Sequence, residues 1–164
     1  MSKQYELTKR TKRVNGHILH RIRALRSITG GVEAGVIGGW VESEDNLSHE
    51  GNCWVDVQAN VFGDAYVSEN ALVYDDAQVY DKAQIFGNAT VCEMAQVYGK
   101  AQIFGNANVD DKAHVHGNAT VCGYVMLYGK SMVYGNAMLC GHAPSIWKIL
   151  YMWRYISNRQ WPQQ

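Results

Sequence analysis

Aliphatic residues recur at every sixth position through the middle of the chain. Between Gly51 and Ala143 the sequence keeps one frame, which reads V-[YFC]-[GD]-[NK]-A-x from its aliphatic position. The aliphatic positions run in steps of six from Val55 to Leu139, and each is followed four places later by a small residue, nearly always alanine. In a short strand alternate residues share a face, so A-x-V-Y predicts Ala and Val pointing inward and their neighbours pointing outward.

A longer period of 18 residues is superimposed on the six-residue frame. Residues 77–94 and 95–112 are identical at 13 of 18 positions. Three six-residue units per repeat predict a three-sided coil, with the Gly-Asn, Asp-Lys and Gly-Lys pairs at its corners, because Gly and Asn tolerate positive φ. We therefore expect an all-β chain whose residues 39–144 form a single-stranded parallel β-helix with three hexads per coil.

The segments on either side of the repeat have different patterns. Residues 1–38 predict an N-terminal basic β cap, because Val14-Asn15-Gly16-His17 is typical of a hairpin turn between two alternating strands. Such a cap would cover the open edge of the first coil. Residues 145–164 predict a C-terminal helix and tail, with a short helix over 145–156 that begins at Ser145. That helix could cap the last coil, join subunits or lie on a membrane surface.

The charge is distributed unevenly, although Lys+Arg and Asp+Glu each number 15. Residues 1–26 hold eight cations against one Glu, a net +7, and residues 27–144 hold fourteen acids against four Lys, a net −10. The zero total makes a nucleic-acid partner unlikely. Asp75 and Asp76 belong to the acidic shaft and Arg21 and Arg23 to the basic head, so we consider all four binding candidates. The alternatives are solvated turns for the acids and head-to-shaft contacts between subunits.

Cysteine usage and hydropathy point to a protein of the cytoplasm. None of the four cysteines forms a CxxC pair, so we expect free thiols that fill space in the coils, and no metal site. No apolar run reaches the length of a transmembrane span, and the N-terminal stretch lacks the apolar core of a secretory signal.

The repeat resembles the hexapeptide-repeat, left-handed parallel β-helix proteins. The resemblance covers about two thirds of the chain, and the left-handed coil is implied by it. The stretches YELT, HILHRIRAL and GVIGGWVESEDNLSHEGNCWV are similar to bacterial and prophage YdcK-like proteins, which are often labelled transferases. The resemblance implies that acyltransferases and homotrimers are common among such folds. Aromatic residues directly after the aliphatic position are a departure from the usual family pattern.

Those aromatic residues form outward columns when they are sorted by the 18-residue period. One column contains Tyr80, Tyr98, His116 and Tyr134, and another contains Phe86 and Phe104. Columns of this size exceed what a monomer normally exposes, so we expect at least one to be buried in an oligomer, with stacking within one chain as the alternative.

The sequence leaves three hypotheses for function. The first is a non-enzymatic scaffold of phage or prophage origin, a trimer that binds a host protein through its acidic shaft and so inhibits host defence. The second is an acyltransferase with an intersubunit site, acyl-CoA as its cofactor and His116 or His114 as general base. The third is a protein that holds a nucleotide-like ligand. We expect no enzymatic activity and no cofactor, because no loop interrupts the frame from Gly51 to Ala143.

Overall fold

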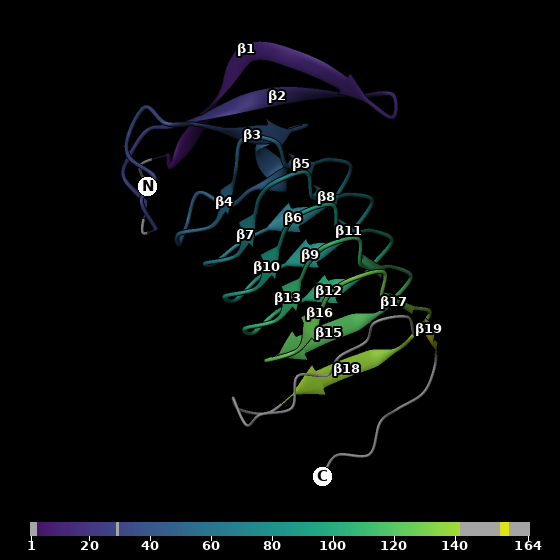
Figure 1. The fold of residues 1–164 in the computed structure, drawn as a ribbon. Coiled ribbons are helices and arrows are strands. Elements are labelled where there is room, and N and C mark those ends of the chain that lie inside the picture. Colours follow the sequence, from purple (N-terminus) through teal and green to yellow (C-terminus); the bar gives the residue numbers. More distant parts are fainter. Residues whose placement is uncertain (1–2, 29, 142–154, 158–164) are drawn as a thin grey trace.

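The chain forms a three-sided parallel β-solenoid closed at one end by a hairpin (Figure 1). The structure is a computed structural model that describes residues 3–28 and 30–141, and the backbone of 155–157. Short strands lie above one another in three sheets, and the chain passes from one sheet to the next at each corner. The predicted all-β solenoid with an N-terminal hairpin is therefore confirmed.

The largest of the three sheets has nine strands, and its outer surface is called face 1. It contains β1 (Tyr5–Val14), β2 (His17–Ala24), β3 (Ile37–Val41), β5 (Asn60–Val61), β8 (Gln78–Val79), β11 (Gln96–Val97), β14 (His114–Val115), β17 (Met132–Tyr134) and β19 (Tyr155–Ser157).

The other two sheets have five strands each. Face 2 is the outer surface of β4 (Trp54–Val55), β7 (Leu72–Val73), β10 (Thr90–Val91), β13 (Asn108–Val109) and β16 (Met126–Leu127). Face 3 is the outer surface of β6 (Tyr66–Val67), β9 (Gln84–Ile85), β12 (Gln102–Ile103), β15 (Thr120–Gly123) and β18 (Met138–Gly141).

The core consists of the two inward columns that the frame predicts. Every aliphatic position from Val55 to Leu139 is buried, and so is the small residue that follows it, from Ala59 to Ala137. Parallel pairing holds these columns in register, because each residue pairs with the residue 18 positions further on, as Val79 does with Val97. Since every coil repeats the same inward pair, the apolar core is continuous along the shaft.

The corners require residues that accept positive φ. Gly105 has φ of +74°, and a Cβ placed on it would lie 2.8 Å from the backbone nitrogen of Gly123 in the next coil. Acidic residues occupy other corner positions at positive φ, and three of them accept a hydrogen bond from a glycine one coil further on. These pairs are Glu69 with the N–H of Gly87, Asp81 with Gly99, and Asp111 with Gly129.

The hairpin covers the first edge of the solenoid, as the sequence predicts. Strands β1 and β2 pair antiparallel around Asn15 and Gly16, which both have positive φ. Strand β2 then pairs antiparallel with β3, whose other edge joins β5 of the solenoid. A 3₁₀ turn, η1 (Glu44–Asn46), leads the chain from β3 towards face 3. The hairpin thus satisfies backbone groups that would otherwise form an open edge.

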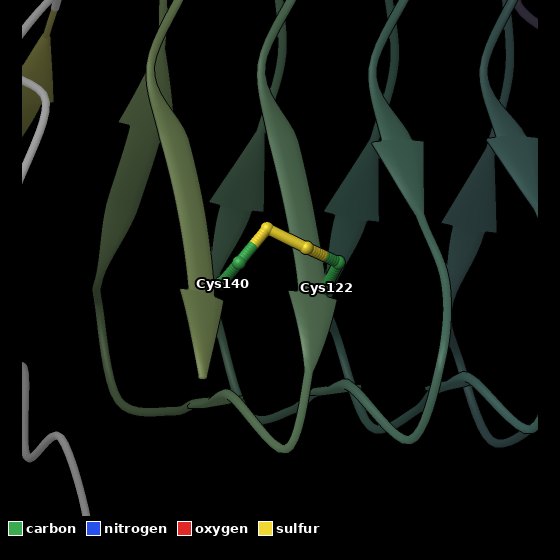
Figure 2. The surroundings of a disulfide bond; sticks show 2 residues. All are labelled: Cys122 and Cys140. Atoms are coloured by element: carbon green, nitrogen blue, oxygen red, sulfur yellow. A yellow bond between two sulfur atoms is a disulfide. The ribbon is translucent and has the colours of Figure 1, made fainter. Parts of the chain in front are cut away.

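Two cysteines form a disulfide, so the prediction of free thiols is wrong at those positions. Cys122 of β15 and Cys140 of β18 are directly paired in the parallel register, with their Cα atoms 4.5 Å apart, and a disulfide joins them (Figure 2). Cys53 and Cys92 are free and buried, as expected. The 18-residue period explains the bond, because it places the two side chains one above the other within disulfide range.

The predicted C-terminal helix falls mostly outside the described residues. The predicted helix covers residues 145–156, of which 145–154 are not described. Tyr155 and Ile156 are not helical, because they begin strand β19, which pairs parallel with β17. Pairing with β17 gives the backbone N–H and C=O groups of β19 hydrogen-bond partners within the sheet.

Candidate functional site

A continuous column of six aromatic rings runs down face 1, and we call it the aromatic ladder. It consists of His17, Phe62, Tyr80, Tyr98, His116 and Tyr134. From Phe62 to Tyr134 neighbouring ring centroids lie 4.8–5.5 Å apart, and the ring planes are within 12° of parallel. The ring of His17 is tilted by 45° against that of Phe62, and its Nδ1 donates a hydrogen bond to the Glu42 carboxylate, 2.9 Å away. The rings stack within one chain, which was the alternative in the sequence analysis, and burial of the column in an oligomer stays a prediction. The ladder also joins the hairpin to the shaft.

Stacking determines which parts of these rings another molecule can touch. A planar group inserted between two rings would need a spacing of about twice the ~3.5 Å contact distance, which is wider than the ladder offers. Ring faces inside the ladder are therefore occupied, and ring edges and phenolic hydroxyls are left for contact. Burial is the largest cause that raises the pKa of Tyr80, to about 12, followed by Tyr98 and Asp81. Its hydroxyl therefore stays protonated and neutral.

A column of mostly polar residues lies beside the aromatic ladder. Asn60, Gln78, Gln96, His114 and Met132 occupy the outward position before each inward aliphatic residue, and they pair in register. On face 1 the strands β5, β8, β11 and β14 have two residues each and pair in register from coil to coil. The face offers edges of aromatic rings and amide groups at a constant spacing.

The two candidate catalytic histidines lie together on strand β14 and its exit. His114 and His116 flank the buried Val115, so both point outward as predicted. Burial, and secondarily the neighbouring His114, lowers the pKa of His116, which is therefore neutral at pH 7. No carboxylate hydrogen-bonds either imidazole within residues 3–28 and 30–141. A neutral imidazole can accept a proton, but here no acid orients it.

The second predicted column, on face 3, is shorter. Phe86 and Phe104 stack with their centroids 4.8 Å apart, and below them the same column continues as the Cys122–Cys140 disulfide. Sequence reasoning placed both cysteines in this column but did not join them. The signal was the 18-residue separation, which makes two cysteines direct neighbours across adjacent coils.

The acidic residues do not form a single patch. Asp75 and Asp76 lie at the corner between faces 2 and 1, Asp64 and Asp81 at the corner between faces 1 and 3, and Glu69 at the third corner. Glu69 and Asp81 are hydrogen-bonded to corner glycines, and Asp64 lies 3.9 Å from Lys82. Asp75 and Asp76 are exposed and keep charge available for a partner. In the described part of the chain, no three His, Cys, Asp or Glu side chains gather to hold a metal ion.

The two candidate arginines of the hairpin have different surroundings. Arg23 is ion-paired with Glu6 across the β1–β2 pair. Arg21 pairs in register with Trp40 of β3 and lies over its indole ring, 4.8 Å from guanidinium carbon to centroid. Sequence reasoning missed Trp40 as a partner, because the antiparallel register of β2 and β3 contains an irregularity between Arg21 and Arg23.

Parts of the chain are similar in sequence to a known repeat family and to a known protein. The YdcK Beta solenoid repeat family matches residues 83–99. The chain is also 46% identical over 43 residues to a protein of Escherichia coli (strain K12) named uncharacterized acetyltransferase YdcK. The chain is a β-solenoid of six-residue units, and one part of it is similar to the YdcK repeat. The aligned segment covers 26% of this chain and 13% of that relative. The similarity supports the architecture of the coils, and it leaves the activity of the whole relative as a matter for proposal.

The described residues contain no helix that is long and apolar enough to cross a membrane.

Proposed function

We propose that this chain is a non-enzymatic β-solenoid scaffold that acts by binding protein through the aromatic ladder of face 1. The observation that supports this most directly is the continuous ladder of stacked rings from His17 to Tyr134. Its half-buried rings offer edges and hydroxyls along the whole shaft, which suits an extended protein surface better than a small planar ligand. Aromatic residues are also the type most enriched at protein interfaces.

The partner that fits this face best is another copy of the same chain. Packing face 1 of three copies around a common axis would remove the ladder from water and leave faces 2 and 3 outside. Closed symmetry is the rule among soluble homo-oligomers. The resemblance to hexapeptide-repeat proteins, in which homotrimers are common, supports three copies. We place the assembly in the cytoplasm, where the exposed Asp75 and Asp76 corner is free to meet a host protein. The proposed origin in a phage or prophage rests on the resemblance alone.

Charge introduced into the ladder tests this proposal. Tyr98→Lys places an ammonium among stacked rings, whereas Gln84→Lys adds the same charge at an exposed position of face 3. We expect Tyr98→Lys to elute with a mass near the 18.4 kDa of one chain and the control to keep the mass of the assembly, measured by chromatography with light scattering. A wild-type chain that is monomeric at every concentration would refute the proposal, and so would a Tyr98→Lys variant that assembles like the control.

Acyl transfer is the second candidate, favoured by the similarity to a protein named as an acetyltransferase and by a neutral, outward-facing His116. In that function His116 would remove a proton from the acceptor, with acyl-CoA as donor and His114 beside it. Acetyl-CoA consumption with amine acceptors, compared between wild type and His116→Ala, distinguishes the two candidates. Turnover that falls by two orders of magnitude in the variant would establish the enzyme and displace the scaffold.

A further inference from the structure

Two cations of the hairpin lie over the ring of Trp40 in β3, and a third lies near them. Lys12 of β1 and Arg21 of β2 both lie over the indole ring of Trp40, at 4.6 and 4.8 Å from its centroid. Arg10 precedes Lys12 by two residues on the same strand, and its charge acts on Arg21. We call Arg10, Lys12 and Arg21 the cation cluster. Strands β1 and β2, which carry it, extend the sheet beyond β3 at the N-terminal end of the shaft (Figure 1).

No carboxylate in the described part of the chain forms an ion pair with the cation cluster. The Lys and Arg ion pairs there are Lys3–Glu44, Arg23–Glu6 and Lys82–Asp64, and none includes a member of the cluster. Asp76 and Asp56 influence Lys12 and Arg21 electrostatically, yet neither forms an ion pair with them. The Nε atom of Arg21 is buried and has no hydrogen-bond partner. An unpaired guanidinium donor is costly, because it has lost its water without gaining an acceptor.

The pKa shifts of Lys12 and Arg21 agree with their close contacts around Trp40. Burial is the main cause that lowers the pKa of Lys12, and the charge of Arg21 lowers it further. Burial likewise lowers the pKa of Arg21, and the charge of Arg10 adds to the effect. Arg21 is repelled by both Arg10 and Lys12, and Lys12 and Arg21 have lost part of their hydration. The three cations form a region of positive potential, and a bound anion would relieve the repulsion.

We propose that the cation cluster binds a phosphate-type oxyanion. A phosphoryl group carries about two negative charges and several acceptor oxygens, so it can accept from a guanidinium fork and an ammonium together. The indole face is already covered by Lys12 and Arg21, so a nucleobase has no ring to stack on at this point. The site therefore recognises the phosphate itself. That phosphate can belong to a small phosphomonoester or to a nucleic-acid backbone.

Calorimetric titration tests the site with two probes at low salt, inorganic phosphate and a 20-bp DNA duplex. We expect Arg21→Gln and Lys12→Gln each to weaken binding about tenfold or more, as the loss of a charged hydrogen bond implies. Lys9→Gln and Arg13→Gln are the matched controls, because they remove equal charge from alternate positions of the same strand. We expect the controls to change affinity less than about twofold.

The outcomes distinguish a small phosphomonoester from a nucleic-acid backbone as the source of the phosphate. Binding of free phosphate that depends on Arg21 and Lys12 supports a small-molecule site, whereas duplex binding with the same dependence and no measurable phosphate binding supports a backbone site. Absence of binding with both probes overturns the proposal, and so does an equal loss in the controls, which would indicate diffuse charge. Should Arg21→Gln fail to fold, Arg21→Lys keeps the charge and removes the fork, and we expect it to weaken binding as well.

Discussion

His116 is a titratable residue inside the aromatic ladder. It is stacked between Tyr98 and Tyr134, and burial followed by His114 lowers its pKa from the ordinary value of 6.5. The unfolded chain therefore binds more protons than the folded chain as the pH falls below that value. Stability is then highest above pH 6.5 and is lost as the pH falls towards the lowered pKa.

His116→Phe removes this titration and keeps a ring in the ladder. We expect the variant to lose less stability than the wild type between pH 7.5 and pH 5.5, because no proton binds preferentially to its unfolded state at that position. Urea unfolding across this range measures the difference. Tyr98→Phe is the control, since it changes the neighbouring ring without touching the histidine. A wild-type pH slope in His116→Phe would show that the ladder does not suppress protonation.

At the scale of elements, the coils were predictable because each position has one role that recurs every 18 residues. The Val and Ala columns had to point inward, as hydropathy predicts. Gly, or an acidic residue such as Asp81, turns the corners at positive φ, where the sequence predicted the Gly-Asn and Asp-Lys pairs. The same arithmetic assigns Glu69, Asp75 and Asp81 to three different corners. The contact of Arg21 with Trp40 depends on an irregular strand pairing, and no periodic pattern in the sequence predicts such a contact.

The disulfide ties the last described coil to the one before it. Reduction frees a segment of 18 residues, and closing a loop of that size is associated with about 3 kcal/mol. We expect a reductant to lower the unfolding temperature of the wild type and to leave the double variant Cys122→Ser, Cys140→Ser unchanged.

Thiol counting provides a second readout for the same bond. Two of the four cysteines, Cys53 and Cys92, should react with an alkylating reagent after unfolding without reductant. The control for the thermal experiment is Cys92→Ala, which should keep its response to reductant. Alkylation of all four thiols in the untreated protein would contradict the bond.

At the scale of the whole molecule, function is divided between the shaft and its cap. The shaft carries an uninterrupted aromatic ladder from the hairpin to β17, and the cap carries a cluster of cations without paired acids. The sequence indicated the ladder and the basic cap, because the first follows from the period and the second from composition. The sequence could not say which cations gather around Trp40, since that arrangement requires the register of three antiparallel strands.

The central claim is that face 1 is an interface between copies of this chain. Native mass spectrometry of the untagged protein, purified gently from cells, measures the assembly and any bound molecule together. The account predicts an assembly of three chains of 18.4 kDa each, without a bound acyl carrier. A species with the mass of one chain, at concentrations where the protein is folded, would contradict the claim that the aromatic ladder is buried by assembly.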